Sequence, residues 1–152
     1  MMKAFLIGIT LICLFGCDTS PKTFHETQTD LYVRSDKFVT LLEENDTTQA
    51  RKMIAQPYYL NHKSSIDTLL NAFIKDFRLL KNYERGNILV FYPEGFYLYR
   101  IRYTDRSGII LQIDVSYKKE IATTDIVKLA LITTESFKKV AGQNIIPAYD
   151  FE

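Results

Sequence analysis

The sequence predicts an α+β fold in which helices come first and an antiparallel sheet follows. Apolar residues recur with a period of about 3.6 from residue 30 to the region of Gly86, and beyond it the period shortens to about two. The second half is also rich in β-branched and aromatic residues, divided by compact turn sequences. We therefore expect three N-terminal helices followed by a four-stranded antiparallel meander.

The first two helices are separated by a polar break. The first is expected over about residues 30–44, where its apolar residues form one stripe. Asp46 and Gln49 have the spacing of a capping pair, which predicts the start of a shorter second helix. Pro57 is expected to end that helix, because the residue before a proline is driven out of helical geometry.

The third helix is predicted to be the longest. Tyr58-Tyr59-Leu60 precedes it, either as a short strand or as an aromatic plug, and Ser64-Ser65 is expected to open it. Gly86 is expected to close it. Its apolar residues keep the helical spacing through five turns: Ile66, Leu69, Leu70, Phe73, Phe77 and Leu80.

Four strands are expected over residues 88–92, 96–103, 109–117 and 126–133. Short turn sequences containing Gly95 and Gly108 join the first three strands, and a longer connection precedes the fourth. Side chains alternate between the two faces of a strand, so one face should pack on the helices and the other should be wetter.

The chain begins with an apolar run of about twelve residues, Ala4 to Phe15, which follows Lys3. The run is shorter than the roughly twenty apolar residues that a membrane span needs. The sequence Leu14-Phe15-Gly16-Cys17 closes it and resembles the lipobox of bacterial lipoproteins, which implies cleavage before an acylated cysteine. An ordinary secretory signal is the alternative. Leu14 argues against this alternative, because cleavage of an ordinary secretory signal needs small residues at positions −3 and −1 and leucine is not small.

These features give a domain organisation. Residues 1–16 are read as the lipoprotein signal peptide, 17–29 as the lipidated Cys17 with a polar, flexible tether, and 30–134 as one α+β domain followed by a tail at 135–152. The protein is expected to be a membrane-anchored lipoprotein that faces the periplasm or the cell exterior. Asp18 follows the cysteine and resembles the signal that keeps lipoproteins of enteric bacteria in the inner membrane. That rule does not hold in all bacteria, so the choice between inner and outer membrane stays open.

The order of elements resembles that of the NTF2-like, or cystatin-like, α+β superfamily. The resemblance covers roughly residues 30–134. The sequence pattern is most similar from Tyr97 to Ile132, where a hairpin precedes a strand of alternating apolar residues. It implies a curved sheet that wraps the long helix into a cone. A competing assignment is the fold of small outer-membrane assembly lipoproteins, which has one helix and one strand fewer than expected here.

Composition excludes several classes of partner. The formal charge is +1 and falls to zero once Lys3 is removed, and no basic stripe indicates a nucleic-acid partner. His25 falls in the predicted tether and His62 in a predicted loop, without ligand spacing for a metal. Neither a metal nor another cofactor is expected, and a mature chain whose one thiol is acylated has no disulfide to form.

Asp114 is the one carboxylate in the middle of a predicted strand. Arg100, Arg102 and Lys128 are strand residues able to face it, so Asp114 could act as a base or form a cross-strand ion pair on a solvated face. The ion pair is the favoured interpretation, because such pairs are common.

Tyrosines could line a pocket for an apolar ligand, or they could fill a core that lacks tryptophan. The core interpretation is favoured. The tyrosines in question are Tyr58, Tyr59, Tyr92, Tyr97, Tyr99 and Tyr103.

The sequence thus predicts a non-catalytic, lipid-anchored module of the cell envelope that binds a small apolar ligand or a partner protein. The alternative is an immunity, inhibitor or envelope-assembly lipoprotein that acts only through protein contact, and the least favoured is an isomerase or hydrolase using Asp114. The candidate ligand-binding residues are Tyr97, Tyr99, Tyr103, Arg100, Arg102 and Asp114.

Overall fold

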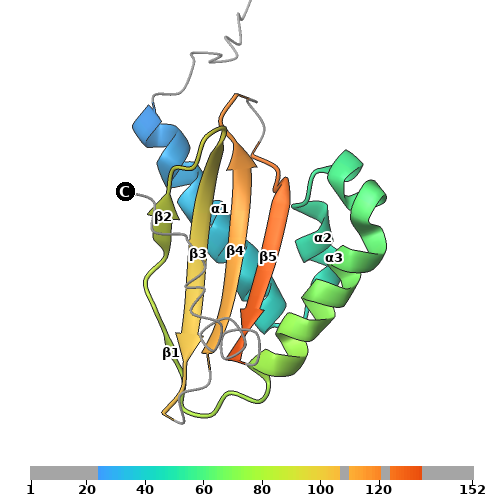
Figure 1. Ribbon diagram of the computed structural model, residues 1–152, viewed down its shortest axis with the longest axis vertical. Coiled ribbons are helices and arrows are strands. Elements are labelled where there is room, and N and C mark those ends of the chain that lie inside the picture. The colour runs from blue at the N-terminus through green and yellow to red at the C-terminus, as the bar shows by residue number, and fades with distance from the viewer. Residues whose placement is uncertain (1–23, 107–109, 121–123, 135–152) are drawn as a thin grey trace, which may run out of the picture.

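The computed structural model describes residues 24–106, 110–120 and 124–134. The predicted signal peptide at 1–16, the predicted lipidation site Cys17 and the tail at 135–152 lie outside the described residues. Helices come first and an open antiparallel sheet follows, which confirms the α+β class (Figure 1).

Helix α1 (Phe24–Glu43) crosses one face of the sheet (Figure 1). It buries a stripe at helical spacing, and its Ser35 hydroxyl lies 3.0 Å from the Tyr117 hydroxyl in the sheet. The helix starts six residues earlier than predicted, so residues 24–29 are helical although they were assigned to the tether. No proline or glycine occurs between Pro21 and Pro57, so nothing local stops the helix from extending. The stripe consists of Leu31, Ser35, Phe38, Val39 and Leu42.

Helix α2 (Thr47–Lys52) begins as predicted. The Gln49 amide donates to the Asp46 Oδ1 at 3.0 Å, which is the capping bond expected from the spacing of these two residues.

Helix α3 (Gln56–Phe77) differs from the prediction at both ends. Pro57 lies in the first turn of α3 and does not end α2. Proline is tolerated in the first turn because the backbone N–H groups of that turn have no partner within the helix. The predicted short strand or aromatic plug, Tyr58-Tyr59-Leu60, is therefore helical. The backbone leaves helical geometry at His62 (φ −126°, ψ 21°), so the predicted start at Ser64 marks the part of α3 that follows this kink.

The C-terminal end of α3 lies well before Gly86, the predicted stop. Residues 84–86, which the prediction placed at the end of the helix, pair with the sheet instead. The Gly86 amide donates to the Arg102 carbonyl at 2.8 Å, and the preceding Glu84 and Arg85 pair with Thr104 and Tyr103.

The sheet has five strands, β1 (Glu84–Arg85), β2 (Leu89–Phe91), β3 (Phe96–Thr104), β4 (Ile110–Lys118) and β5 (Lys128–Thr133). β2, β3, β4 and β5 correspond to the four predicted strands and pair antiparallel in that order. The count is one more than predicted, because β1 and β2 both pair with β3 along the same edge. α3 runs beside β5 at the opposite edge (Figure 1).

The two faces of the sheet are chemically distinct. We call the side that packs on α1 the helix face; it carries Tyr97, Tyr99, Ile101 and Tyr103 of β3, all buried. The other side, the far face, alternates with it and carries the residues Leu98, Arg100, Arg102, Gln112, Asp114 and Ser116. The predicted separation of a helix-packed face from a more polar face is therefore present, but the far face is not the wetter one. Its buried residues are Leu98, Arg100, Gln112, Asp114 and Ser116.

Candidate functional site

The predicted ligand-binding residues lie on opposite faces of the sheet. Tyr97, Tyr99 and Tyr103 belong to the helix face, whereas Arg100, Arg102 and Asp114 belong to the far face. One pocket cannot be lined by both groups, since the sheet itself separates them.

The helix-face tyrosines are mainly core residues. Tyr99 and Tyr103 are fully buried, and the Tyr99 ring meets the Tyr117 ring edge to face at 5.6 Å between centroids. The hydroxyls still find partners, as buried phenols require. Tyr99 donates to the Gln28 carbonyl at 3.2 Å, and Tyr103 donates to the carboxylate of Glu43.

Burial raises the pKa of three of these phenols above the ordinary value of 10.0. It raises the pKa of Tyr117 to about 12, against the lowering effects of the Ser35 hydrogen bond and of Arg34. It also raises the pKa of Tyr99, and that of Tyr103, where the bond to Glu43 adds to the shift.

Alkaline solution should therefore destabilise the fold. Between pH 10 and 12 the unfolded chain releases phenolic protons that the folded protein retains, so the free energy of unfolding should fall by up to about 1.4 kcal/mol per pH unit for each protected tyrosine. Denaturant titrations at several pH values measure this slope, and Tyr117→Phe should make it shallower. A free energy of unfolding that stays constant up to pH 12 would contradict the burial of these phenols.

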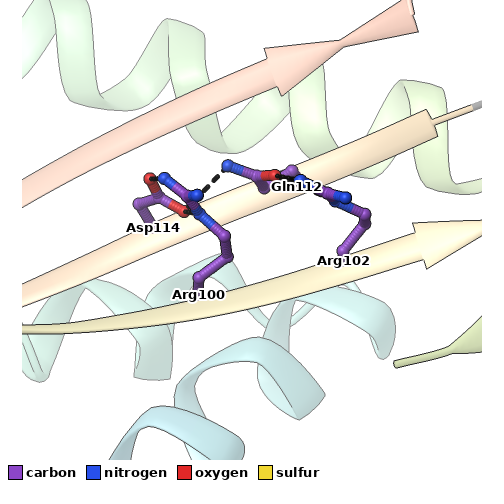
Figure 2. Close-up of polar contacts among 4 residues, drawn as sticks. All are labelled: Arg100, Arg102, Gln112 and Asp114. Carbon is purple, nitrogen blue, oxygen red and sulfur yellow. Dashed lines mark hydrogen bonds and ion pairs between the residues drawn. The ribbon is translucent and has the colours of Figure 1, made fainter. Parts of the chain in front are cut away.

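The polar group on the far face centres on an ion pair (Figure 2). Arg100 and Asp114 are register partners on β3 and β4, as their facing positions in the sequence suggested. The Arg100 Nε donates to Asp114 Oδ1 at 3.0 Å and its Nη2 donates to Oδ2 at 2.9 Å. The side chains are 10% and 5% exposed, so the expected solvated pair is a buried one.

Gln112 joins a second arginine to this pair. Its Nε2 donates to Asp114 Oδ1 at 3.1 Å, while its Oε1 accepts from Arg102 Nε and Nη2 at 3.0 and 2.8 Å. The four side chains form one row, Arg102, Gln112, Asp114 and Arg100, across two strands (Figure 2). Two guanidinium groups and one carboxylate leave this row with a net positive charge.

This geometry favours a structural role for Asp114. Both of its oxygens accept charge-assisted bonds from one guanidinium, the strong bidentate arrangement that favours an ionised, fixed carboxylate. Asp114 also lines neither of the two pockets described below. A general base needs access to a substrate proton, and this carboxylate is directed at arginine.

The larger pocket lies between α3 and the edge of the sheet, and we call it the α3–β5 pocket. It has a volume of about 370 Å³ and opens to solvent. Its apolar wall consists of Ile66, Leu69, Phe96, Val127 and Leu129, and its polar groups are Tyr58, His62, Ser65, Lys118 and Lys128.

A smaller pocket of about 300 Å³ lies between the N-terminal part of α1 and β2. Its polar groups largely bond to one another: Gln28 Nε2 donates to the Tyr92 hydroxyl at 2.8 Å, and Tyr99 donates to the Gln28 carbonyl. No charged residue is among the described residues that line it: Gln28, Thr29, Tyr32, Val90, Tyr92 and Tyr99.

The sequence interpretation missed most of the α3–β5 pocket. Tyr58 is among the candidate lining tyrosines, but the predicted start at Ser64 leaves Tyr58 and His62 off the helix that carries Ser65, Ile66 and Leu69. With α3 beginning at Gln56, the lining residues of the helix fall at the spacing i, i+4, i+7, i+8 and i+11, which is one helical face. They are Tyr58, His62, Ser65, Ile66 and Leu69.

Neither a metal-binding cluster nor a membrane-spanning helix occurs among the described residues. No group of three or more His, Cys, Asp or Glu side chains within them could hold a metal ion. Within the same ranges, no helix combines the length with the apolar character that a membrane span needs. Comparisons of the chain with family models, with curated proteins and with solved structures return no significant match.

Proposed function

We propose that this protein is a lipid-anchored binding module of the cell envelope that holds a small ligand without transforming it. The α3–β5 pocket carries this proposal, because its volume of about 370 Å³ falls within the range of ligand sites and it combines an apolar wall with a few polar groups. The bidentate pair of Asp114 with Arg100 supports the non-catalytic part.

The anchor in this proposal is Cys17, held in the membrane by acyl chains, with the domain facing the periplasm or the cell exterior. The lipobox-like sequence Leu14-Phe15-Gly16-Cys17 supports it. Two or more acyl chains hold a protein firmly, since each buried methylene contributes about 0.8 kcal/mol. The start of α1 at Phe24 leaves only residues 18–23 between the cysteine and the first helical residue. The domain would then stay within about 25 Å of its anchor, given 3.3 to 3.6 Å per extended residue.

We further propose that the domain is a member of the NTF2-like group and that its sheet curves into a cone. The order of helices and antiparallel strands supports this assignment. α1, and not the third helix of the prediction, would then be the helix that the sheet wraps, because it packs across the helix face through Ser35 and Tyr117.

Replacing the anchor cysteine should release the protein. Cys17→Ser should move the protein from the membrane fraction to the soluble fraction, or leave an uncleaved precursor, because serine has no thiol to acylate. Cell fractionation followed by immunoblotting measures the partition. Cys13→Ser is the matched control, since that cysteine lies in the segment removed by cleavage, and it should remain membrane-bound. Equal partition of the two variants, with both at the size of the processed chain on the immunoblot, would overturn the anchoring proposal.

Contact with a protein partner is the second candidate function. It is favoured by apolar side chains that are more than half exposed, among them Leu60 (62%), Leu79 (60%) and Leu89 (51%). Leu60 lies in α3, Leu79 shortly after it and Leu89 in β2, and none of them lines either pocket, so the α3–β5 pocket supports ligand binding better. Crosslinking in the native membrane separates the two functions, since a partner module should be captured with a protein and a ligand carrier should not.

A further inference from the structure

We propose that the α3–β5 pocket binds an amphipathic anion, a carboxylate or a similar small anionic group on an apolar body. This inference rests on the proposed function and names the class of ligand. It follows from how charge, apolar surface and hydrogen-bond donors are arranged around the pocket.

The charge around this pocket is of one sign. Lys118 and Lys128 line it, and no carboxylate is among its described lining residues. No ion pair of either lysine occurs within the described part of the chain. Ser116 pairs with Lys128 in the register of β4 and β5, so the two lysines are diagonal neighbours on one face of the sheet. Side chains of that length at diagonal positions can reach one group between them.

Further donors lie on the helix side of the pocket. The Tyr58 hydroxyl accepts a hydrogen bond from the Leu129 amide at 3.3 Å, which leaves the hydrogen of the phenol for another acceptor. The His62 ring lies 5.0 Å from the Tyr58 ring, at the kink of α3, and Ser65 follows on the same side. These groups suit an anion, because cationic and hydroxyl donors form the strongest bonds with charged acceptors.

The rest of the wall is apolar. Ile66 and Leu129 are buried at its base, and Leu69, Phe96 and Val127 continue it. A small hydrophilic anion would leave this surface without a partner, and a neutral apolar molecule would leave the two lysines without one. An anionic group attached to an apolar body satisfies both halves of the pocket.

Calorimetric titration with a matched pair of probes tests the inference. The lipid-anchored protein in nanodiscs is titrated with 4-phenylbutyrate and with its neutral amide, and empty nanodiscs provide the blank. We expect the carboxylate to bind at least about tenfold more tightly than the amide, the ratio that one charge-assisted hydrogen bond supplies. Its affinity should fall as salt is raised, because exposed charges are screened.

Two variants locate the binding. Lys118→Gln with Lys128→Gln should remove the preference for the carboxylate, while Lys52→Gln with Lys75→Gln changes the net charge equally at exposed positions outside both pockets and should leave it intact. Leu69→Trp should fill the pocket and weaken both probes. The chain has no tryptophan, so the fluorescence of this residue also reports that the variant is folded.

The outcomes separate this inference from the proposed function. Equal binding of carboxylate and amide, with both weakened by Leu69→Trp, would overturn the anionic class and keep ligand binding. A carboxylate preference that survives the loss of both lysines would overturn the assignment to this pocket. Absence of binding by either probe to the unaltered protein would overturn the inference, and a crosslinked protein partner in its place would overturn the proposed function as well.

Discussion

Replacing Asp114 with alanine is expected to lower the free energy of unfolding by about 3 to 5 kcal/mol, the cost of leaving a buried charge without its partner. The Arg100 guanidinium would remain at 10% exposure with neither of its two bonds to the carboxylate. Gln112 would lose its acceptor at the same time, which adds an unsatisfied amide. Chemical denaturation measures the change.

Two controls make the Asp114 result specific. Asp125→Ala removes a carboxylate that is 45% exposed and pairs with Arg34. It should lower the free energy of unfolding by less than about 1 kcal/mol. The double variant Arg100→Met with Asp114→Leu should recover most of the loss, because an apolar pair replaces a buried ionic one at little cost. A loss for Asp114→Ala no larger than that for Asp125→Ala would show that the pair is solvated, as the sequence alone suggested.

Replacing Phe73 with alanine is the second large effect, with an expected loss of about 3 to 5 kcal/mol. The ring is fully buried and meets the rings of Phe77 and Tyr103, each at 5.9 Å between centroids. Its removal leaves a cavity where the C-terminal part of α3 packs on β3. Thermal or chemical denaturation measures the loss.

Leu79→Ala is the matched control for Phe73, since Leu79 follows shortly after α3 and is 60% exposed. It should change the free energy of unfolding by less than about 0.5 kcal/mol. If the two variants were equally stable, α3 would not be packed against the sheet, and the α3–β5 pocket would lose one of its walls.

Periodicity predicted the order of elements well, and it failed where distant parts of the chain decide the outcome. Pro57 is compatible with the end of one helix and with the first turn of the next, and local rules do not choose between them. Glu84 and Arg85 leave the helical pattern because β3 offers them backbone partners, and that strand lies far along the sequence.

The candidate site, too, was predictable where local alternation decides it and not where distant segments meet. Alternation put Arg100 and Asp114 on one face, opposite Tyr99 and Tyr103, and the structure agrees. Burial of the pair could not be predicted, because it depends on how the whole face is covered. The α3–β5 pocket combines residues 58–69 with Phe96, Lys118 and residues 127–129, and such a pairing of segments is visible only after folding.

Mass spectrometry of the protein extracted from its own membrane tests the central claim most directly. Under denaturing conditions we expect a chain that begins at Cys17 and carries acyl groups on that residue. Under native conditions we expect an additional small mass that is lost from the Leu69→Trp variant. An unmodified thiol at residue 17 together with a native mass equal to that of the bare chain would contradict the account.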